Sequence, residues 1–98
     1  RILVLATGGL SHQLDGERAG LINKPFDLEF LDNLVGHPVI AGALTTHQIV
    51  EQAGTQGVEL LMWAAMRGAL GERARRVGQT YHIPISNTAA CVLTLGPA

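Results

Sequence analysis

The fold of this 98-residue chain is decided by residues 57–69, which read Gly57-Val58-Glu59-Leu60-Leu61-Met62-Trp63-Ala64-Ala65-Met66-Arg67-Gly68-Ala69. This is the strongest helical stretch of the sequence, and Glu59 and Arg67 are its only charged side chains. A helix that is apolar nearly all round is normally buried on every side. We therefore expect this helix to run through the interior of a domain, with the other elements packed around it.

Three stretches of the chain predict strands. Residues 2–6 form an apolar run of branched and large aliphatic residues that ends before two glycines, a pattern typical of a short strand buried on both faces. Residues 77–83 and 88–95 predict two further strands that would pair antiparallel. Strands and helices together indicate the α/β class, with a mixed sheet flanked by helices.

Two shorter helices are expected between the first strand and the apolar helix. Pro25 suits the first turn of a helix, and Gly36 would end that helix. Thr45 and Gln48 have the spacing of a capping box, in which each side chain bonds to the backbone of the other residue. A helix through residues 49–53 would follow this cap.

Composition narrows the function classes. The net charge of −1 argues against a nucleic-acid partner, which would need a basic surface. Cys91 is the only cysteine, so no intrachain disulfide can form, which fits a cytoplasmic location. The longest apolar stretch, residues 89–95, is too short to cross a bilayer, and no membrane association is expected. Because only 15% of the residues are charged, part of the surface is expected to be buried against something outside this chain, which would then not be self-contained.

Glu59 is the most informative residue of the apolar helix. At helical spacing it shares a face with Met62, Trp63 and Met66. A carboxylate on such a face is costly unless a cation or strong hydrogen-bond donors meet it. Two explanations stay open: a structural carboxylate bonded to backbone amides or to an arginine, and a metal ligand.

His12 and the turn at residues 86–88 are further candidates. His12 follows two glycines just beyond the expected first strand, and ligands of open α/β sheets gather beyond the carboxyl ends of strands. Its imidazole could carry protons near neutral pH, or could simply bond to the loop backbone. Ser86, Asn87 and Thr88 could form an ordinary turn or could anchor a polar group of a ligand.

Several motifs in the same order along the chain resemble a known family, the class III extradiol ring-cleavage dioxygenases of the protocatechuate 4,5-dioxygenase beta-subunit type. The resemblance covers the whole chain and is strongest over residues 57–69. The other motifs that carry it are Thr7-Gly8-Gly9-Leu10-Ser11-His12-Gln13-Leu14, Gly20-Leu21-Ile22-Asn23, Phe26-Asp27, Phe30-Leu31-Asp32, Glu51-Gln52-Ala53-Gly54, Tyr81-His82-Ile83-Pro84 and Ser86-Asn87-Thr88-Ala89.

The resemblance implies a fold, a cofactor and roles for individual residues. Residues 1–98 would be the C-terminal part of a single α/β dioxygenase domain whose N-terminal part is absent. The family holds a non-haem Fe(II) with two histidines and one glutamate; Glu59 matches the glutamate, and His12 matches the histidine that acts as acid and base. Both histidine ligands belong to the N-terminal part of the family's domain, so this chain alone is not expected to hold the iron or to be active.

The resemblance also implies substrates and partners. The reaction would insert both atoms of O2 into a catechol-type ring that resembles protocatechuate or gallate, and Ser86 and Asn87 would bind the substrate carboxylate. Family members work as homo-oligomers or with a small second subunit that covers the site. The alternative is a non-catalytic homologue that keeps the fold and acts as a binding or interaction protein.

Overall fold

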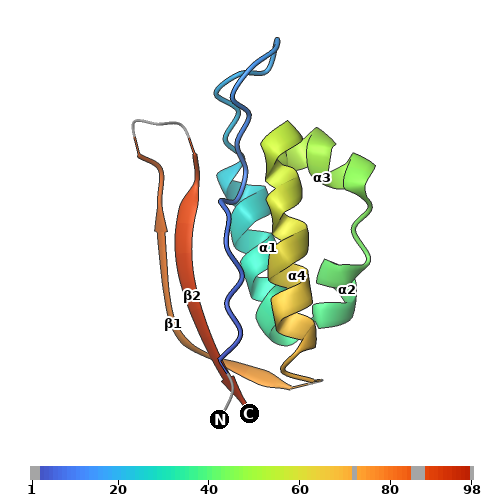
Figure 1. Cartoon of the computed structure of the whole chain (residues 1–98), viewed down its shortest axis with the longest axis vertical. Coiled ribbons are helices and arrows are strands. Elements are labelled where there is room, and N and C mark those ends of the chain that lie inside the picture. Colours follow the sequence, from blue (N-terminus) through green and yellow to red (C-terminus); the bar gives the residue numbers. More distant parts are fainter. Residues whose placement is uncertain (1–2, 72, 85–87, 98) are drawn as a thin grey trace.

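The structure is a computed structural model that describes residues 3–71, 73–84 and 88–97. Two layers make up the fold: a curved two-stranded sheet on one side and a group of helices on the other (Figure 1). No helix within the described ranges combines the length and the hydropathy that crossing a bilayer would require. In chain order the elements are α1 (Lys24–Gly36), α2 (Pro38–Gly42), α3 (Thr46–Ala53), the 3₁₀-helix η1 (Thr55–Glu59), α4 (Leu60–Gly68), β1 (Ala74–His82) and β2 (Ala90–Pro97).

Helix α1 confirms the first predicted helix. It begins where the Asn23 side chain accepts a hydrogen bond from the backbone N–H of Phe26, with Pro25 in the first turn. Phe30, Leu31 and Leu34 lie on one face and are buried in the core. This face places α1 between the sheet and the other helices, where it packs on β1, α2, α3 and α4.

Helix α3 confirms the predicted capping box. The Thr45 side chain accepts from the backbone N–H of Gln48, and the Gln48 side chain accepts from the backbone N–H of Thr45. These two bonds satisfy backbone donors that have no partner inside the helix. Ile49 and Ala53 are buried, and Gly54 ends the helix at a positive φ of 89°.

The apolar stretch is helical, but its first residues form the tighter 3₁₀ turn η1 before α4 begins at Leu60. The expectation that this helix is buried on every side is wrong. Met62 is 54% exposed, because α4 packs on α1 and α2 through one face only, which carries Leu60, Trp63 and Arg67. The buried guanidinium of Arg67 donates hydrogen bonds to the backbone carbonyls of Leu34 and Gly71. These bonds replace the hydrogen bonds to water that the charged group loses on burial.

Strands β1 and β2 confirm the antiparallel pair. In the register of the pair, Tyr81 lies opposite Cys91 and Thr80 lies opposite Val92, with an irregularity between Arg76 and Gly78. The described residues form this one sheet, so the expected mixed sheet is reduced to an antiparallel hairpin. The assignment to the α/β class holds, since helices cover one face of a sheet.

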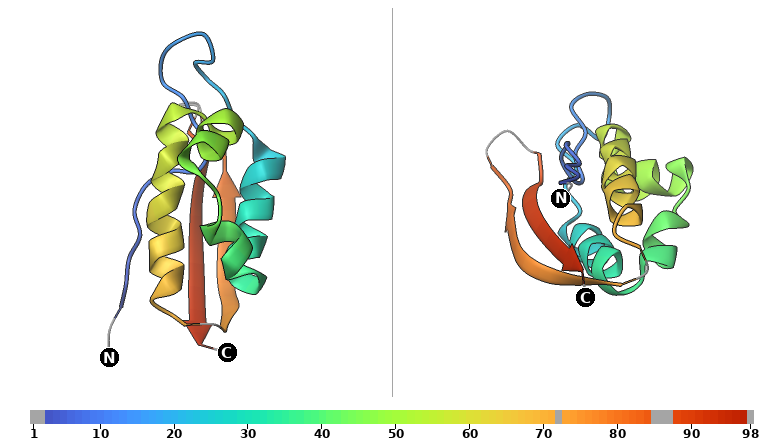
Figure 2. Two further views of the ribbon diagram at one scale, coloured as in Figure 1. Left: turned by 90° about the vertical axis from the view of Figure 1, so that its right-hand side faces the viewer. Right: turned by 60° about the horizontal axis from the view of Figure 1, so that its bottom comes forward.

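The strand expected at residues 2–6 is not formed over its described part, residues 3–6. These residues are extended but pair with no other strand of the described chain, and they run at the edge of the molecule beside α4 (Figure 2). Leu3 is 82% exposed and Leu5 is 75% exposed. A strand is stabilised by hydrogen bonds to a neighbour and by layers on its faces. Within the described chain residues 3–6 have no backbone hydrogen bond to a strand, and Ala6 is the residue among them that packs against the core.

The capping box gives a direct test of the local fold. Replacing Thr45 by alanine removes the acceptor for the N–H of Gln48 and should lower the free energy of unfolding by about 0.5–2 kcal/mol. Urea denaturation followed by circular dichroism measures this change. The control is Thr46→Ala, which alters the first residue of the helix instead of the cap and should have a much smaller effect. Equal losses in the two variants would contradict the assigned cap.

Candidate active site

The site is built on residues 10–12, which are buried and pinned by their backbone. The N–H of Leu10 donates to the carbonyl of Ala89 at 2.9 Å, and the N–H of Ala89 donates to the carbonyl of Ser11 at 3.2 Å. The N–H of His12 donates to the carbonyl of Ala53 at 2.8 Å. Residues 10–12 are therefore held between the sheet on one side and the end of α3 on the other.

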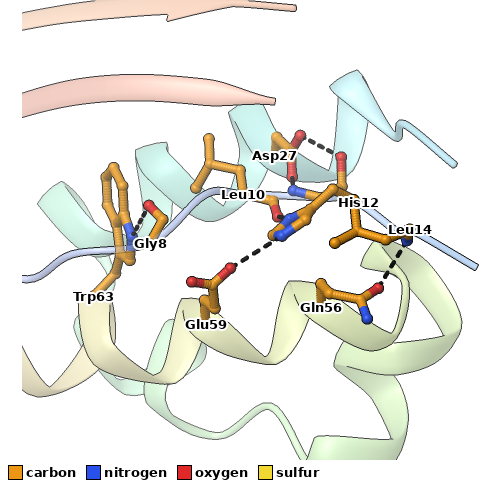
Figure 3. Close-up of polar contacts among 9 residues, drawn as sticks. Gly8, Leu10, His12, Leu14, Asp27, Gln56, Glu59 and Trp63 are labelled. Carbon is orange, nitrogen blue, oxygen red and sulfur yellow. Dashed lines mark hydrogen bonds and ion pairs between the residues drawn. The ribbon is translucent and has the colours of Figure 1, made fainter. Parts of the chain in front are cut away.

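The His12 imidazole has a defined orientation in this setting. Its Nδ1 lies 2.8 Å from the carbonyl oxygen of Leu10, and a carbonyl can only accept, so Nδ1 carries a proton. The other nitrogen, Nε2, lies 3.0 Å from Oε1 of Glu59 (Figure 3). The side chain of His12 is only 6% exposed. One imidazole nitrogen is thus fixed by the backbone, and the other faces a carboxylate.

Glu59 reaches His12 from the junction of η1 and α4. Its side chain is 42% exposed, so the expectation of a buried carboxylate is corrected to a partly exposed one at a helix end. The side-chain contact that the structure gives Glu59 is with the His12 imidazole, and within the described part of the chain no arginine pairs with it. The two residues singled out as metal ligand and acid/base from the sequence therefore meet, although 47 residues separate them.

Gly8 makes this approach possible. Its φ of +121° is rarely adopted by other residues, and a Cβ built on it would lie 2.7 Å from Oε2 of Glu59. The indole N–H of Trp63 donates to the carbonyl of Gly8 at 3.3 Å, one helical turn beyond Glu59. The face that Glu59 shares with Trp63 therefore lies against the glycine turn, whereas Met62, assigned to the same face, points to solvent.

Asp27 is a buried carboxylate of the site region that sequence reasoning missed. It lies in the first turn of α1 and is fully buried. One oxygen accepts from the backbone N–H of Ser11 at 3.0 Å, and the other accepts from the hydroxyls of Ser11 and Tyr81, each at 2.6 Å. Asp27 stands beside Phe26 in one of the quoted motifs, but nothing in the sequence indicated partners 16 and 54 residues away.

Burial governs the ionisation of this network. Loss of solvent raises the pKa of Asp27 above its ordinary value of 3.8, and hydrogen bonds from Ser11 and Tyr81 oppose that rise. Burial and the neighbouring Asp27 carboxyl raise the pKa of Tyr81, which stays a hydroxyl donor at neutral pH. Because the folded-state pKa of Asp27 is raised, its contribution to stability is largest at low pH and is lost as the pH rises through that pKa.

The turn predicted at residues 86–88 is described by the structure only at Thr88. Ser86 and Asn87 lie outside the described residues, so their predicted role is not tested. Thr88, which follows them in the chain, forms an isolated antiparallel bridge with His12. Within the described ranges no group of three or more histidine, cysteine, aspartate or glutamate side chains is placed to hold a metal ion.

A histidine with one nitrogen tied to a carbonyl and the other facing a carboxylate, at a glycine turn of an α/β fold, is the kind of site that enzymes use for acid/base or metal-assisted chemistry. Comparison with known proteins assigns the family. The family model described as the catalytic LigB subunit of aromatic ring-opening dioxygenase matches residues 1–92, and the chain belongs to this family. The resemblance drawn from the sequence is therefore confirmed.

A curated relative extends the comparison. The chain is 37% identical over 93 residues to a gallate dioxygenase of Pseudomonas putida. The match covers 95% of this chain and 27% of that protein, so the chain spans about a quarter of the relative's length.

The glycine turn predicts a specific steric effect. In Gly8→Ala the new methyl group would collide with Glu59 and the residue would keep an unfavourable φ, so unfolding should become easier by about 1–3 kcal/mol. Urea denaturation measures the loss. The matched control is Gly68→Ala at the end of α4, where an added Cβ meets nothing within 4 Å and stability should be unchanged or slightly higher. A Gly8→Ala protein as stable as the control would show that the backbone does not pass this close to Glu59.

Proposed function

We propose that the protein is a non-haem Fe(II)-dependent extradiol dioxygenase that opens a catechol-type ring with O2. The observation that carries this proposal is the 3.0 Å contact between Nε2 of His12 and Oε1 of Glu59 in a chain of the LigB family. Because the chain covers about a quarter of the related gallate dioxygenase, the activity is proposed for the protein that contains it and not for these residues alone.

Glu59 is the proposed iron ligand of this chain. Its carboxylate is partly exposed at a helix end and is approached by an imidazole instead of a guanidinium, which fits an anionic oxygen donor available to a cation. The two histidine ligands that complete the family's set would come from elsewhere in the protein. Ferrous iron bound by two histidines and one carboxylate supplies open positions for O2 and for a chelating catechol.

His12 is the proposed acid and base. Since Leu10 fixes the Nδ1 proton, Nε2 is the atom that would accept a proton from a substrate hydroxyl and return it during ring opening. The imidazole is buried among residues 10–12, so the proton transfer would take place away from bulk water. The short distance to Glu59 would keep the acid/base group beside the bound substrate.

Substrate and partners follow the resemblance and stay proposals. The relative is named for gallate, and we propose a protocatechuate- or gallate-like ring whose carboxylate is bound by Ser86 and Asn87. The bridge between Thr88 and His12 supports this, because it ties the residue after Asn87 to the acid/base group. A homo-oligomer or a small second subunit is proposed as partner, as the resemblance implies. The cytoplasmic location stays a prediction.

Replacing Glu59 by glutamine tests the ligand assignment. The amide keeps the size of the side chain but removes the anionic donor, so the purified protein should lose most of its bound iron, measured per mole of protein. Glu51→Gln, an exposed glutamate on α3, is the matched control and should retain iron. Full iron retention by Glu59→Gln would refute the role and would favour the non-catalytic alternative if turnover were also absent.

Replacing His12 by phenylalanine tests the acid/base assignment. The variant should bind iron in the same amount as the unchanged protein, but ring cleavage should slow by about 10²–10⁴-fold because the proton carrier is gone. Oxygen uptake and the absorbance of the ring-opened product measure the rate. His47→Phe, at an exposed histidine of α3, serves as control. Near-normal turnover by His12→Phe would remove this residue from the mechanism.

A further inference from the structure

The carboxylate of Asp27 accepts two hydrogen bonds from Ser11, the residue next to His12. Oδ1 accepts from the backbone N–H of Ser11, and Oδ2 accepts from its hydroxyl at 2.6 Å. The Ser11 hydroxyl oxygen in turn accepts from the backbone N–H of Asn23 at 2.9 Å. Both the peptide and the side chain of Ser11 are thereby fixed to the beginning of α1. Figure 3 shows the Asp27 carboxylate and its dashed contacts with the segment that leads to His12.

The hydrogen bonds from Ser11 to Asp27 affect the His12 imidazole, because the backbone of residues 10–12 sets the orientation of that ring. The Nδ1 proton of His12 is held by the carbonyl of Leu10, so the direction of that carbonyl decides where Nε2 points. The carbonyl of Leu10 and the N–H of Ser11 belong to the same peptide plane. A bond that fixes the N–H of Ser11 therefore also fixes the carbonyl that sets the orientation and the tautomer of His12.

The Tyr81 hydroxyl provides a comparison that distinguishes positioning of His12 from general structural support of Asp27. It donates to the same oxygen of Asp27 at the same 2.6 Å as the Ser11 hydroxyl does, but it comes from β1 and not from residues 10–12. The two hydroxyls are therefore equivalent in distance and acceptor, while only one of them belongs to the segment that carries the imidazole.

We propose that Asp27 is a positioning residue, which acts through Ser11 to hold His12 in the Nδ1-protonated orientation that points Nε2 at the reacting groups. The proposal rests on the proposed function for its effect on turnover. The orientation of His12 itself can be measured without turnover. An asparagine at position 27 would leave one oxygen acceptor for the donors that now bond to two oxygens, so the grip on Ser11 would be lost in part.

The test compares Asp27→Asn, Ser11→Ala and Tyr81→Phe in the purified protein. Asp27→Asn should lower kcat on the order of 10- to 100-fold with a smaller change in KM and with iron content unchanged. Ser11→Ala keeps the backbone N–H bond to Asp27 and loses the hydroxyl bond, so it should lower kcat less, on the order of 10-fold. Tyr81→Phe should change kcat by no more than about 3-fold, since the bond it removes does not reach the peptide of residues 10 and 11. Asp32→Asn, at an exposed aspartate of the same helix, should leave turnover unchanged.

A second readout reports on His12 directly. The ¹⁵N resonances of histidine-labelled protein distinguish the two neutral tautomers, and the His12 signal is assigned by its loss in His12→Phe. In the unchanged protein Nδ1 of His12 should carry a proton, whether or not Nε2 carries one as well. In Asp27→Asn and Ser11→Ala part of the population should lack the Nδ1 proton. If Asp27→Asn does not fold, Ser11→Ala against Tyr81→Phe carries the comparison.

The outcomes separate the two claims. An altered tautomer in a protein that cleaves no catechol would support the positioning role while overturning the proposed function. Equal losses of kcat in Ser11→Ala and Tyr81→Phe would overturn the positioning role, because they would show a general loss of support. A fall in kcat with an unchanged His12 signal would also overturn it.

Discussion

The structure depends on how residues 10–12 are held. Backbone hydrogen bonds tie these three residues to Ala89 beside β2 and to Ala53 at the end of α3, and the Asp27 carboxylate ties them to α1. The fourth contact, between His12 and Glu59, ties them to the junction of η1 and α4. Elements that are far apart in the sequence therefore meet at one short segment, and the candidate acid/base group is the last residue of that segment.

Burying polar groups at this point has an energetic consequence. Ser11, His12 and Asp27 are all removed from water, and an unpaired polar group in such a place costs about 1–3 kcal/mol. Each of the three has a partner in the described structure, so the network stabilises one arrangement of the segment over its alternatives. A site that exchanges protons needs this rigidity, because acid/base groups act only within hydrogen-bond reach of their target.

The sequence predicts the local elements well because their signals are local. The capping box at Thr45, the Pro25 start of α1 and the hairpin of β1 and β2 all depend on residues close together in the chain. The segment at residues 3–6 was wrongly expected to be a strand, since a strand depends on neighbours that an apolar run does not specify. The expected full burial of residues 57–69 failed for a similar reason: hydropathy does not say which face of a helix is covered.

The sequence also predicts some residues of the candidate site and misses others. His12 and Glu59 were found from the chemistry of a carboxylate among apolar residues and a histidine after glycines, together with a family resemblance. Asp27 was missed because an aspartate in the first turn of a helix is ordinary at the level of sequence. Its significance comes from the Ser11 and Tyr81 hydroxyls that the fold brings to it.

Glu59 and His12 are proposed to serve one site, the first by binding a metal ion and the second by carrying a proton. Diffraction recorded at the iron absorption edge from crystals of the iron-loaded protein would locate the metal relative to both side chains. An anomalous peak is expected within bonding distance of the Glu59 carboxylate, with Nε2 of His12 nearby and not bonded to the metal. A peak away from Glu59, or one bonded to His12, would contradict it.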